Sequence, residues 1–184
     1  MSRGRGISVY ANLNLIKQAV GADLTTISSS RWVAQKYIER PLLIHGVKFD
    51  IRQWFVVTDW EQLTIWMYRY SVNCVTSQTI LKFRRSYARF STVPFTLEDL
   101  DGQIHLTNNA IQRKFNLSED CHEDLPYEKM WFCEELDEYL ASIGHVNSFR
   151  QKIYPAMKNI LTQTCLAAQE NAEPRRRRYL TFFL

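Results

Sequence analysis

Residues 47–59 read VKFDIRQWFVVTD, and the alternation in the first half of this stretch decides the fold class. In a strand, Val47, Phe49 and Ile51 would lie on one face and the charged residues between them on the other. The turn residues DWEQ and the apolar run LTIWMYR follow at 59–69 and predict a hairpin. An antiparallel sheet is therefore expected at the centre of the fold.

Further strands are predicted on both sides of this hairpin. The sequence YARFS at 87–91 favours a strand, and RWVAQKYIERPLLI at 31–44 favours another, which Pro41 ends or confines to a sheet edge. Residues 70–85 have a β-rich composition but no turn signal that fixes a register. We interpret residues 70–85 as an insertion.

Helices are predicted toward the two ends of the chain. The stretch NLNLIKQAV at 12–20 has apolar residues at helical spacing, with Gly21 as the expected stop. Residues 127–144 and 148–170 carry two longer helical patterns, and Pro155 marks a kink or a restart in the second. The predicted fold class is thus α+β, an antiparallel sheet with flanking helices.

The distribution of charge is more informative than its sum. The formal net charge is +4, and the four arginines Arg175–Arg178 account for all of it. Basic residues are frequent at 31–89 and acidic residues at 98–138, which fits either a basic surface that faces an acidic partner or ordinary solvated faces. The four cysteines form no CxxC pair, and we find no signal-peptide pattern and no apolar run long enough for a bilayer. These features predict a soluble intracellular protein.

Two features of the polar residues suggest a ligand. Lys48, Asp50 and Arg52 would project from one strand face about 7 Å apart, a spacing that suits the base, ribose and phosphate of a nucleotide. An ordinary exposed strand also carries alternating charges, so this pattern alone does not decide. The glycines of SRGRGI at 2–7 would let the backbone approach a phosphate chain, although GRG also suits a nucleic-acid-binding tail. The sequence contains neither a Walker motif nor GxGxxG.

Several motifs taken together resemble one family. SRGRGI, WVAQKYIERPLL, KFDIRQWFVV, RFST and PF separated by Val93, and HLTNNAIQ occur in the order found in the tubulin tyrosine ligase-like family, and they are most similar to its glycine-adding branch. The resemblance implies an ATP-grasp fold, here partial and incomplete at the N- and C-termini. It covers residues 1–170, with the insertion at 70–85, and leaves residues 171–184 as a divergent basic tail.

The resemblance also implies an activity. Members of this family bind ATP and Mg²⁺, activate a carboxylate as an acyl phosphate and let an amine attack it. In the glycine-adding branch the acceptor is a glutamate side chain in the acidic tail of tubulin, and free glycine supplies the amine of the new isopeptide bond. The implied partners are tubulin and microtubules, and the implied location is the cytoplasm, the cytoskeleton and the axoneme of cilia and flagella. We expect a monomer that binds neither nucleic acid nor membranes.

The residues that match the family's motifs take their implied roles one by one. A mobile loop over the phosphates would be formed by Arg3, Gly4, Arg5, Gly6 and Ile7. A hinge that reads the adenine edge would be formed by Gln35, Lys36, Tyr37 and Ile38, with Lys48 and Asp50 at the base and ribose. The catalytic residues Arg52 and Arg89 would lie near the γ-phosphate and the acceptor carboxylate, together with Thr107 and Asn108. Arginine suits that place because its planar fork binds a carboxylate or phosphate through two hydrogen bonds.

The chain departs from the family's pattern at both ends. The family has a lysine in a strand just before the glycine loop, and an aspartate, a glutamate and an asparagine that hold magnesium after the last long helix. We find no counterparts here, so we expect no metal ligands within the chain and predict that the chain alone is a poor or inactive catalyst. Phosphoryl transfer needs no nucleophilic triad, so we expect mainly structural roles for His45, His105, His122 and His145. Adjacent Cys121 and His122 are not expected to form a metal site.

Three alternatives stay open. The first is a glutamate-adding or tyrosine-adding relative within the same enzyme class. The second is a non-catalytic protein whose basic sheet face docks on the acidic tails of tubulin. The third, nucleic-acid binding through RGRG and RRRR, is the least favoured, because no stacking platform accompanies these runs.

Overall fold

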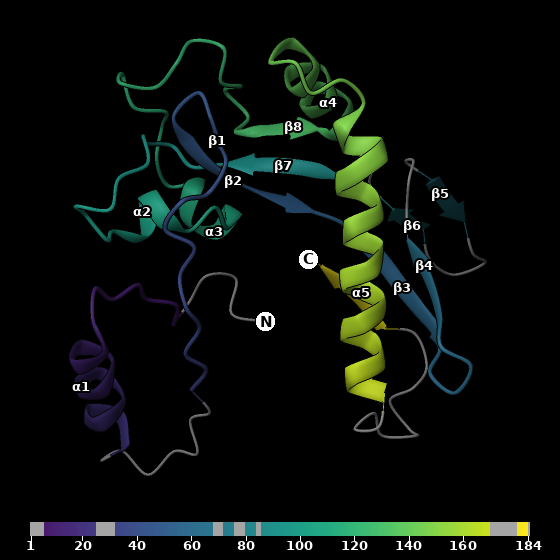
Figure 1. Ribbon diagram of the computed structural model, residues 1–184, viewed down its shortest axis with the longest axis horizontal. Helices are drawn as coiled ribbons and strands as arrows, with labels where there is room; N and C mark the ends of the chain where they lie inside the picture. The colour runs from purple at the N-terminus through teal and green to yellow at the C-terminus, as the bar shows by residue number, and fades with distance from the viewer. Residues whose placement is uncertain are drawn as a thin grey trace. The chain divides into compact units, whose positions relative to one another are not determined.

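The structure is a computed structural model of the 184-residue chain, and it describes residues 6–24, 32–67, 72–75, 80–83, 86–169 and 180–183. The chain divides into two compact units. The first comprises Met1–Phe49 and Phe90–Lys129, and the second comprises Asp50–Arg89 and Met130–Leu184. As the sequence predicted, the fold combines antiparallel strands with flanking helices (Figure 1).

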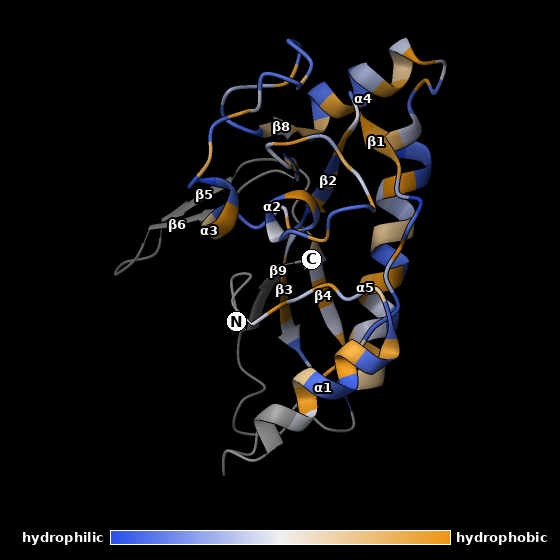
Figure 2. Ribbon diagram, turned by 90° about the vertical axis from the view of Figure 1, so that its left-hand side faces the viewer, coloured by the Kyte–Doolittle hydropathy of each residue, from blue (hydrophilic) through white to orange (hydrophobic). Residues whose placement is uncertain are grey.

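Helix α1 (Leu13–Leu24) confirms the predicted N-terminal helix. It begins where the side-chain oxygen of Asn12 accepts the N–H of Leu15 at 3.1 Å, which satisfies one of the amides that the first turn leaves without a partner. The helix continues past Gly21, the residue predicted to stop it. A single glycine costs a helix only about 1 kcal/mol, so the residues after it can extend the helix. Figure 2 shows polar and apolar residues mixed along α1, and Leu13 is exposed.

The strand predicted over residues 31–44 is mostly wrong. Residues 32–38 have no regular secondary structure, and only β1 (Leu43–Ile44) is a strand. Pro41 lacks the N–H that a ladder would use, which helps to keep β1 short.

A tight turn joins β1 to β2 (Val47–Arg52), and the two strands pair with Ile44 opposite Val47. The turn residues His45 and Gly46 have φ values of 49° and 76°. Two consecutive residues with positive φ are what a two-residue hairpin turn of this kind requires.

The alternating stretch forms two strands where the sequence suggested one. After β2, Gln53 interrupts the ladder, and β3 (Trp54–Asp59) continues in a different sheet. One sheet has the order β1-β2-β7-β8, where β7 is Tyr87–Phe90 and β8 is Met130–Phe132. The sheet of β3 has the order β4-β3-β9, where β4 is Thr64–Met67 and β9 is Leu180–Phe183. The change of sheet therefore takes place at a single residue, Gln53.

Strand β4 (Thr64–Met67) confirms the predicted hairpin with β3. In its turn, the carboxylate of Asp59 accepts the N–H groups of Glu61 and Gln62 at 2.7 and 3.1 Å. Aspartate favours such turns because its side chain can bond to the backbone two residues further on. On its other side β3 pairs with β9 (Leu180–Phe183).

Residues within 70–85 form a hairpin of their own. Strands β5 (Val72–Val75) and β6 (Ile80–Phe83) pair with Val72 opposite Phe83. Strand β7 (Tyr87–Phe90) then confirms the strand predicted from YARFS. The insertion at 70–85 and the domain end at residue 170 stay predictions.

The helix predicted from residue 127 begins later, at α4 (Cys133–Ser142). The residues before it form β8 (Met130–Phe132), which pairs with β7, so the strand ladder takes precedence over the helical pattern. The carboxylate of Glu135 accepts the N–H of Phe132 at 2.8 Å and caps the first turn.

Helix α4 ends just before Gly144, as predicted, and Gly144 has a φ of 89°. The N–H of Gly144 donates to the carbonyl of Ala141 at 3.0 Å, and the N–H of His145 donates to that of Leu140 at 2.7 Å. These two bonds form a Schellman motif, which favours glycine at the left-handed position.

A π-helical turn, η1 (Phe149–Ile153), leads into α5 (Tyr154–Gln169). The restart predicted at Pro155 is confirmed, because α5 begins at Tyr154 and Pro155 lies in its first turn. Proline is tolerated there because the N–H that it lacks would have no intrahelical partner. Helix α5 lies alongside β3 and β4 (Figure 1). The apolar core of this unit is formed by Phe55, Val57, Trp60, Leu161 and Cys165. Within the described part of the chain, no helix combines the length and apolar character needed to cross a bilayer.

Candidate functional site

Strand β2 carries the charged face that the sequence singled out. Lys48, Asp50 and Arg52 occupy alternate positions, and all three are half-buried. A guanidinium nitrogen of Arg52 lies 3.5 Å from a carboxylate oxygen of Asp50, and the side chains of Arg52 and Asp50 are 22% and 38% exposed. The structure thus brings Asp50 and Arg52 together on the strand, partly shielded from water.

Arg89, the second predicted catalytic residue, lies on β7. Its guanidinium carbon is 5.5 Å from the centre of the Tyr87 ring, a cation–π contact. Arg89 is half-buried and pairs across the ladder with Met130 of β8. Strand pairing and the aromatic contact therefore both position this arginine.

The predicted adenine hinge is held by its tyrosine. Gln35, Lys36 and Ile38 are exposed, whereas Tyr37 is half-buried. The hydroxyl of Tyr37 lies 2.7 Å from Nδ1 of His105, and the two rings meet edge to face. The Nε2 of the buried His105 lies 2.8 Å from the carbonyl oxygen of Asp99.

These contacts define the tautomer of His105. A carbonyl can only accept, so Nε2 carries the proton that bonds to Asp99, and in the neutral ring Nδ1 accepts the Tyr37 hydroxyl. The structural role expected for His105 is thus the one observed, since the ring connects the hinge to the loop before α2 (Gly102–His105).

A buried hydrogen-bond network holds the segment that leads to Thr107 and Asn108. The carbonyl oxygen of the Gln112 side chain accepts the N–H of Thr92 at 3.0 Å and its hydroxyl at 2.8 Å. The Gln112 amide donates to the backbone carbonyls of Gln103 and Leu106 at 2.8 and 2.7 Å. Gln112 is fully buried, so these four bonds replace contacts with water.

Thr107 and Asn108 differ in what they can contact. Thr107 is fully buried. Asn108 is half-buried and precedes α3 (Asn109–Gln112), where its carbonyl accepts from Ile111 and Gln112. Its side chain makes no capping bond and is partly exposed, whereas Thr107 is fully buried.

The predicted phosphate loop is only partly described. Arg3, Gly4 and Arg5 lie outside the described residues. Gly6 is exposed, with a φ of 69°, a value that favours glycine, and Ile7 is exposed as well. Among the described residues a Cβ at Gly6 would meet no atom within 4 Å.

Sequence reasoning missed the residues at the change of sheet. Gln53 is fully buried, its amide donates to the carbonyl of Trp54 at 2.8 Å, and its side-chain oxygen accepts the hydroxyl of the buried Ser86. A glutamine directly after the alternating charges was the available signal, because it places an amide where an apolar residue would continue the strand.

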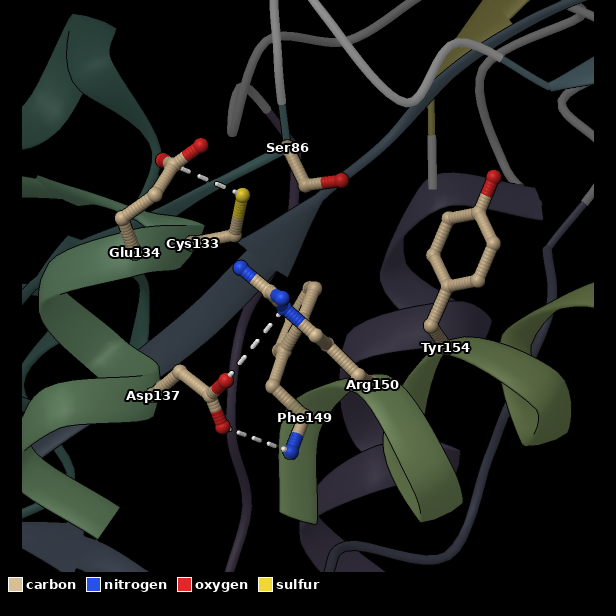
Figure 3. Close-up of a pocket in the computed structure, with 7 residues that line it drawn as sticks. All are labelled: Ser86, Cys133, Glu134, Asp137, Phe149, Arg150 and Tyr154. Carbon is tan, nitrogen blue, oxygen red and sulfur yellow. Dashed lines mark hydrogen bonds and ion pairs between the residues drawn. The ribbon is translucent and has the colours of Figure 1, made fainter. Parts of the chain in front are cut away.

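A small pocket in the second unit was also missed (Figure 3). It is lined by Ser86, Cys133, Glu134, Asp137, Phe149, Arg150 and Tyr154. The carboxylate of Asp137 accepts the N–H of Phe149 at 3.1 Å and lies 3.7 Å from Nε of Arg150, which ties α4 to the π-helical turn. With a volume of about 40 Å³ the pocket is far below the several hundred Å³ typical of a nucleotide-sized ligand.

A third group was not expected from the sequence. His45, His122 and Asp124 lie together in the first unit, although the histidines are far apart in the chain. Burial lowers the pKa of the His45 imidazole and the neighbouring His122 lowers it further, while Asp124 raises it. Spacing along the sequence could not reveal this group, because the fold brings His45 to the other two residues.

The model of the tubulin-tyrosine ligase family matches residues 1–182. The chain belongs to the tubulin-tyrosine ligase family. It is 42% identical over 175 residues to a tubulin monoglycylase, TTLL3, of Danio rerio and to a protein monoglycylase, TTLL8, of Mus musculus, in each case over 95% of this chain. It is 41% identical over 174 residues, 94% of this chain, to tubulin glycylase 3A of Drosophila melanogaster.

The relatives in this family are much longer proteins. The matched segment is 21% of the zebrafish protein, 19% of the mouse protein and 16% of the fly protein. The chain therefore spans about a fifth or less of the length of these relatives. The family assignment expected from the motifs is confirmed.

Proposed function

We propose that this chain supplies nucleotide-binding and acceptor-binding residues of a ligase that adds glycine to glutamate side chains in tubulin tails. The proposal is supported by the tubulin glycylases among its relatives. The observation that carries it is the half-buried pair of Asp50 and Arg52 on β2. In the cell we expect the protein on microtubules, including those of ciliary axonemes.

Arg52 is suited to an anionic ligand. Within the described residues, one of its guanidinium nitrogens lies 3.5 Å from the carboxylate of Asp50. A guanidinium has five N–H donors in a fixed fork, so donors remain for a phosphate or a carboxylate. Because Arg52 is 22% exposed, such a bond would form where water competes less than at the surface.

The hinge around Tyr37 fits a purine edge. Residues 32–38 join no strand of the described sheets, so their backbone groups are not committed to a ladder there. Tyr37 anchors the segment through His105 while its neighbours stay exposed. A peptide held at one residue in this way can offer backbone N–H and C=O groups to an adenine ring.

In the proposed reaction, a glutamate carboxylate of the tail attacks the γ-phosphate of ATP and releases ADP. The amine of glycine then attacks the acyl phosphate, forming the isopeptide bond as phosphate leaves and a proton passes to solvent. Arg52 and Arg89 would hold the anionic groups, since positioning and charge stabilisation are the protein's main tasks in phosphoryl transfer.

The residues described fit the nucleotide better than its magnesium ion. Strand β2 has one carboxylate, that of Asp50, and it already faces Arg52. Magnesium sites use carboxylates that are free to coordinate, together with phosphate oxygens and water. We therefore assign no magnesium ligand among these residues.

Glycine incorporation tests the proposal. The protein expressed from its native transcript is incubated with tubulin, ATP and radiolabelled glycine or glutamate. We expect label from glycine in the tubulin tails and a loss of at least about tenfold in Arg52→Ala, since a charge-assisted hydrogen bond contributes about 1.5–3 kcal/mol. Arg113→Ala, at an exposed arginine, is the matched control.

Two outcomes would overturn this assignment. Incorporation of glutamate alone would identify a glutamate-adding relative. Binding to the tails without incorporation of either amino acid, and lost at high salt, would identify a non-catalytic binder.

A further inference from the structure

Three potential metal ligands meet on two loops of the first unit. His45 lies in the turn between β1 and β2, and His122 and Asp124 lie in the loop that follows α3. One ligand atom from each residue lies within 4.8 Å of those of the other two. The rings of His45 and His122 are nearly parallel, with their centres 4.3 Å apart.

Both loops are attached to the same short segment, residues 92–95. The carbonyl of Gly46 accepts the N–H of Phe95 at 2.9 Å, which fixes the turn that carries His45. The carbonyl of Thr92 accepts the N–H of Ser118 at 2.9 Å, which fixes the start of the other loop. These bonds hold the two loops, and so the backbones of the three residues, near one another before any ion arrives.

The donor set selects a class of metal. Two imidazole nitrogens and one carboxylate oxygen suit Zn²⁺, whereas Mg²⁺ and Ca²⁺ prefer oxygen ligands throughout. Zinc sites with three protein ligands leave a fourth position for water.

One distance shows that two of the ligand atoms can reach the same ion. Nδ1 of His122 lies 3.5 Å from a carboxylate oxygen of Asp124. With zinc bonds of about 2.0–2.1 Å, two tetrahedral ligands lie about 3.3–3.4 Å apart. Neighbouring ligands of an octahedral ion with similar bonds would be about 2.9 Å apart. At 3.5 Å the two atoms need only small rotations to share one ion, and the choice of zinc rests on the donor set.

The side chains of His122 and Asp124 can move to converge on an ion near His45. Nδ1 of His122 accepts the backbone N–H of Asp124 at 3.2 Å, so its lone pair is directed toward Asp124. An ion would replace this N–H, which lies at an exposed position where water can bond to it. The side chains of His122 and Asp124 are 49% and 66% exposed, so both can rotate without disturbing the core.

We propose that His45, His122 and Asp124 bind one Zn²⁺ ion with water as its fourth ligand. The ion joins the β1–β2 turn to the loop after α3. This site is independent of glycine transfer, so it can fail without affecting the proposed function.

A titration of the tag-free, metal-free chain with Zn²⁺, against a chromophoric chelator, tests the site. We expect one ion per chain, and Co²⁺ should give the absorption of a tetrahedral complex. His45→Ala and His122→Ala should each weaken binding at least about tenfold, because even the loss of a residue behind a ligand costs about 10–100-fold. Asp124→Asn should weaken it as well, and Mg²⁺ should not compete.

Controls distinguish this site from other ligands of the chain. His145→Ala removes an exposed histidine outside the group and should bind zinc like the parent. Cys121→Ser tests the neighbouring thiol and should also retain binding. Circular dichroism checks the fold of each variant, and zinc should raise the Tm of the parent more than that of His122→Ala. Unchanged affinity in both ligand-histidine variants, or loss of binding in Cys121→Ser alone, would overturn the proposal.

Discussion

One buried region in each unit is held by different chemistry. Around Gln112 the first unit closes on hydrogen bonds between buried polar groups of residues 92–112. The second unit packs Leu161 and Cys165 of α5 against apolar side chains of β3 and of the turn that follows it. A polar core must satisfy each donor and acceptor, whereas an apolar core needs volume and shape.

This difference matters for the candidate site. The polar network holds the segment with Asn108, while the apolar cluster stabilises the sheet of β3. A defect in the network leaves unpaired polar groups, and a defect in the apolar core leaves a cavity. Substitutions in each region therefore separate the two kinds of stabilisation.

The largest effect is expected for Gln112→Ala. This change removes four buried hydrogen bonds and leaves the N–H of Thr92 and the carbonyl of Leu106 without the partner they have here, while the carbonyl of Gln103 keeps the hydroxyl of Ser91. At about 1–3 kcal/mol for each unsatisfied group, the free energy of unfolding should fall by about 4 kcal/mol. Hydrogen exchange of residues 92–112 is the measurement. Gln163→Ala, at an exposed glutamine of α5, should change little, and equal effects of the two would contradict the network's role.

Leu161→Ala should lower the free energy of unfolding by about 3 kcal/mol, because truncation of a buried leucine leaves a cavity. Urea unfolding followed by tryptophan fluorescence reports it, since Trp60 lies in the same cluster. The neighbouring Ile160 is 54% exposed, so Ile160→Ala should cost clearly less. Similar losses in both variants would show that α5 does not pack as described.

Tyr37→Phe should lower the free energy of unfolding by about 1 kcal/mol, the usual contribution of one hydrogen bond. The change removes the hydroxyl that meets His105 and keeps the ring contact. Faster hydrogen exchange of residues 32–40 is the expected result. Tyr127→Phe, at a tyrosine that is 78% exposed, provides the control, and no difference between the two would remove the hinge's anchor.

The smallest expected effect is that of the Cys165 thiol on how the free energy of unfolding depends on pH. Burial raises the pKa of the Cys165 thiol above its ordinary value of 9.0. Above pH 9.0 the thiol of the unfolded chain loses its proton, while the buried thiol of the folded chain keeps it until a higher pH. The free energy of unfolding therefore falls as the pH rises from 9.0 toward the raised pKa of the folded state. The fall should be smaller in Cys165→Ala. Identical slopes in the two proteins would show that the thiol is not buried as described.

The comparison also explains what the sequence could predict. Alternation and turn residues predicted the β3–β4 hairpin, and helical spacing with Pro155 predicted the restart of α5. Apolar patterns report burial directly, which is why these predictions were confirmed. The break at Gln53 was missed because a buried amide is stabilised by a distant partner, here Ser86, that no local pattern reveals.

The predicted site residues illustrate the same limit. The motifs placed Asp50 and Arg52 on one strand face, and the structure joins them by an ion pair. The burial of Thr107 and the anchoring of Tyr37 by His105 depend on contacts between segments far apart in the sequence. The roles of these residues toward a nucleotide stay predictions.

The most direct test of the central claim is calorimetric titration of the protein with ATP. If the charged face of β2 binds the nucleotide, the parent binds ATP and Arg52→Ala weakens binding by about tenfold or more, while Arg113→Ala binds like the parent. Equal affinity of the parent and Arg52→Ala for ATP would contradict the account.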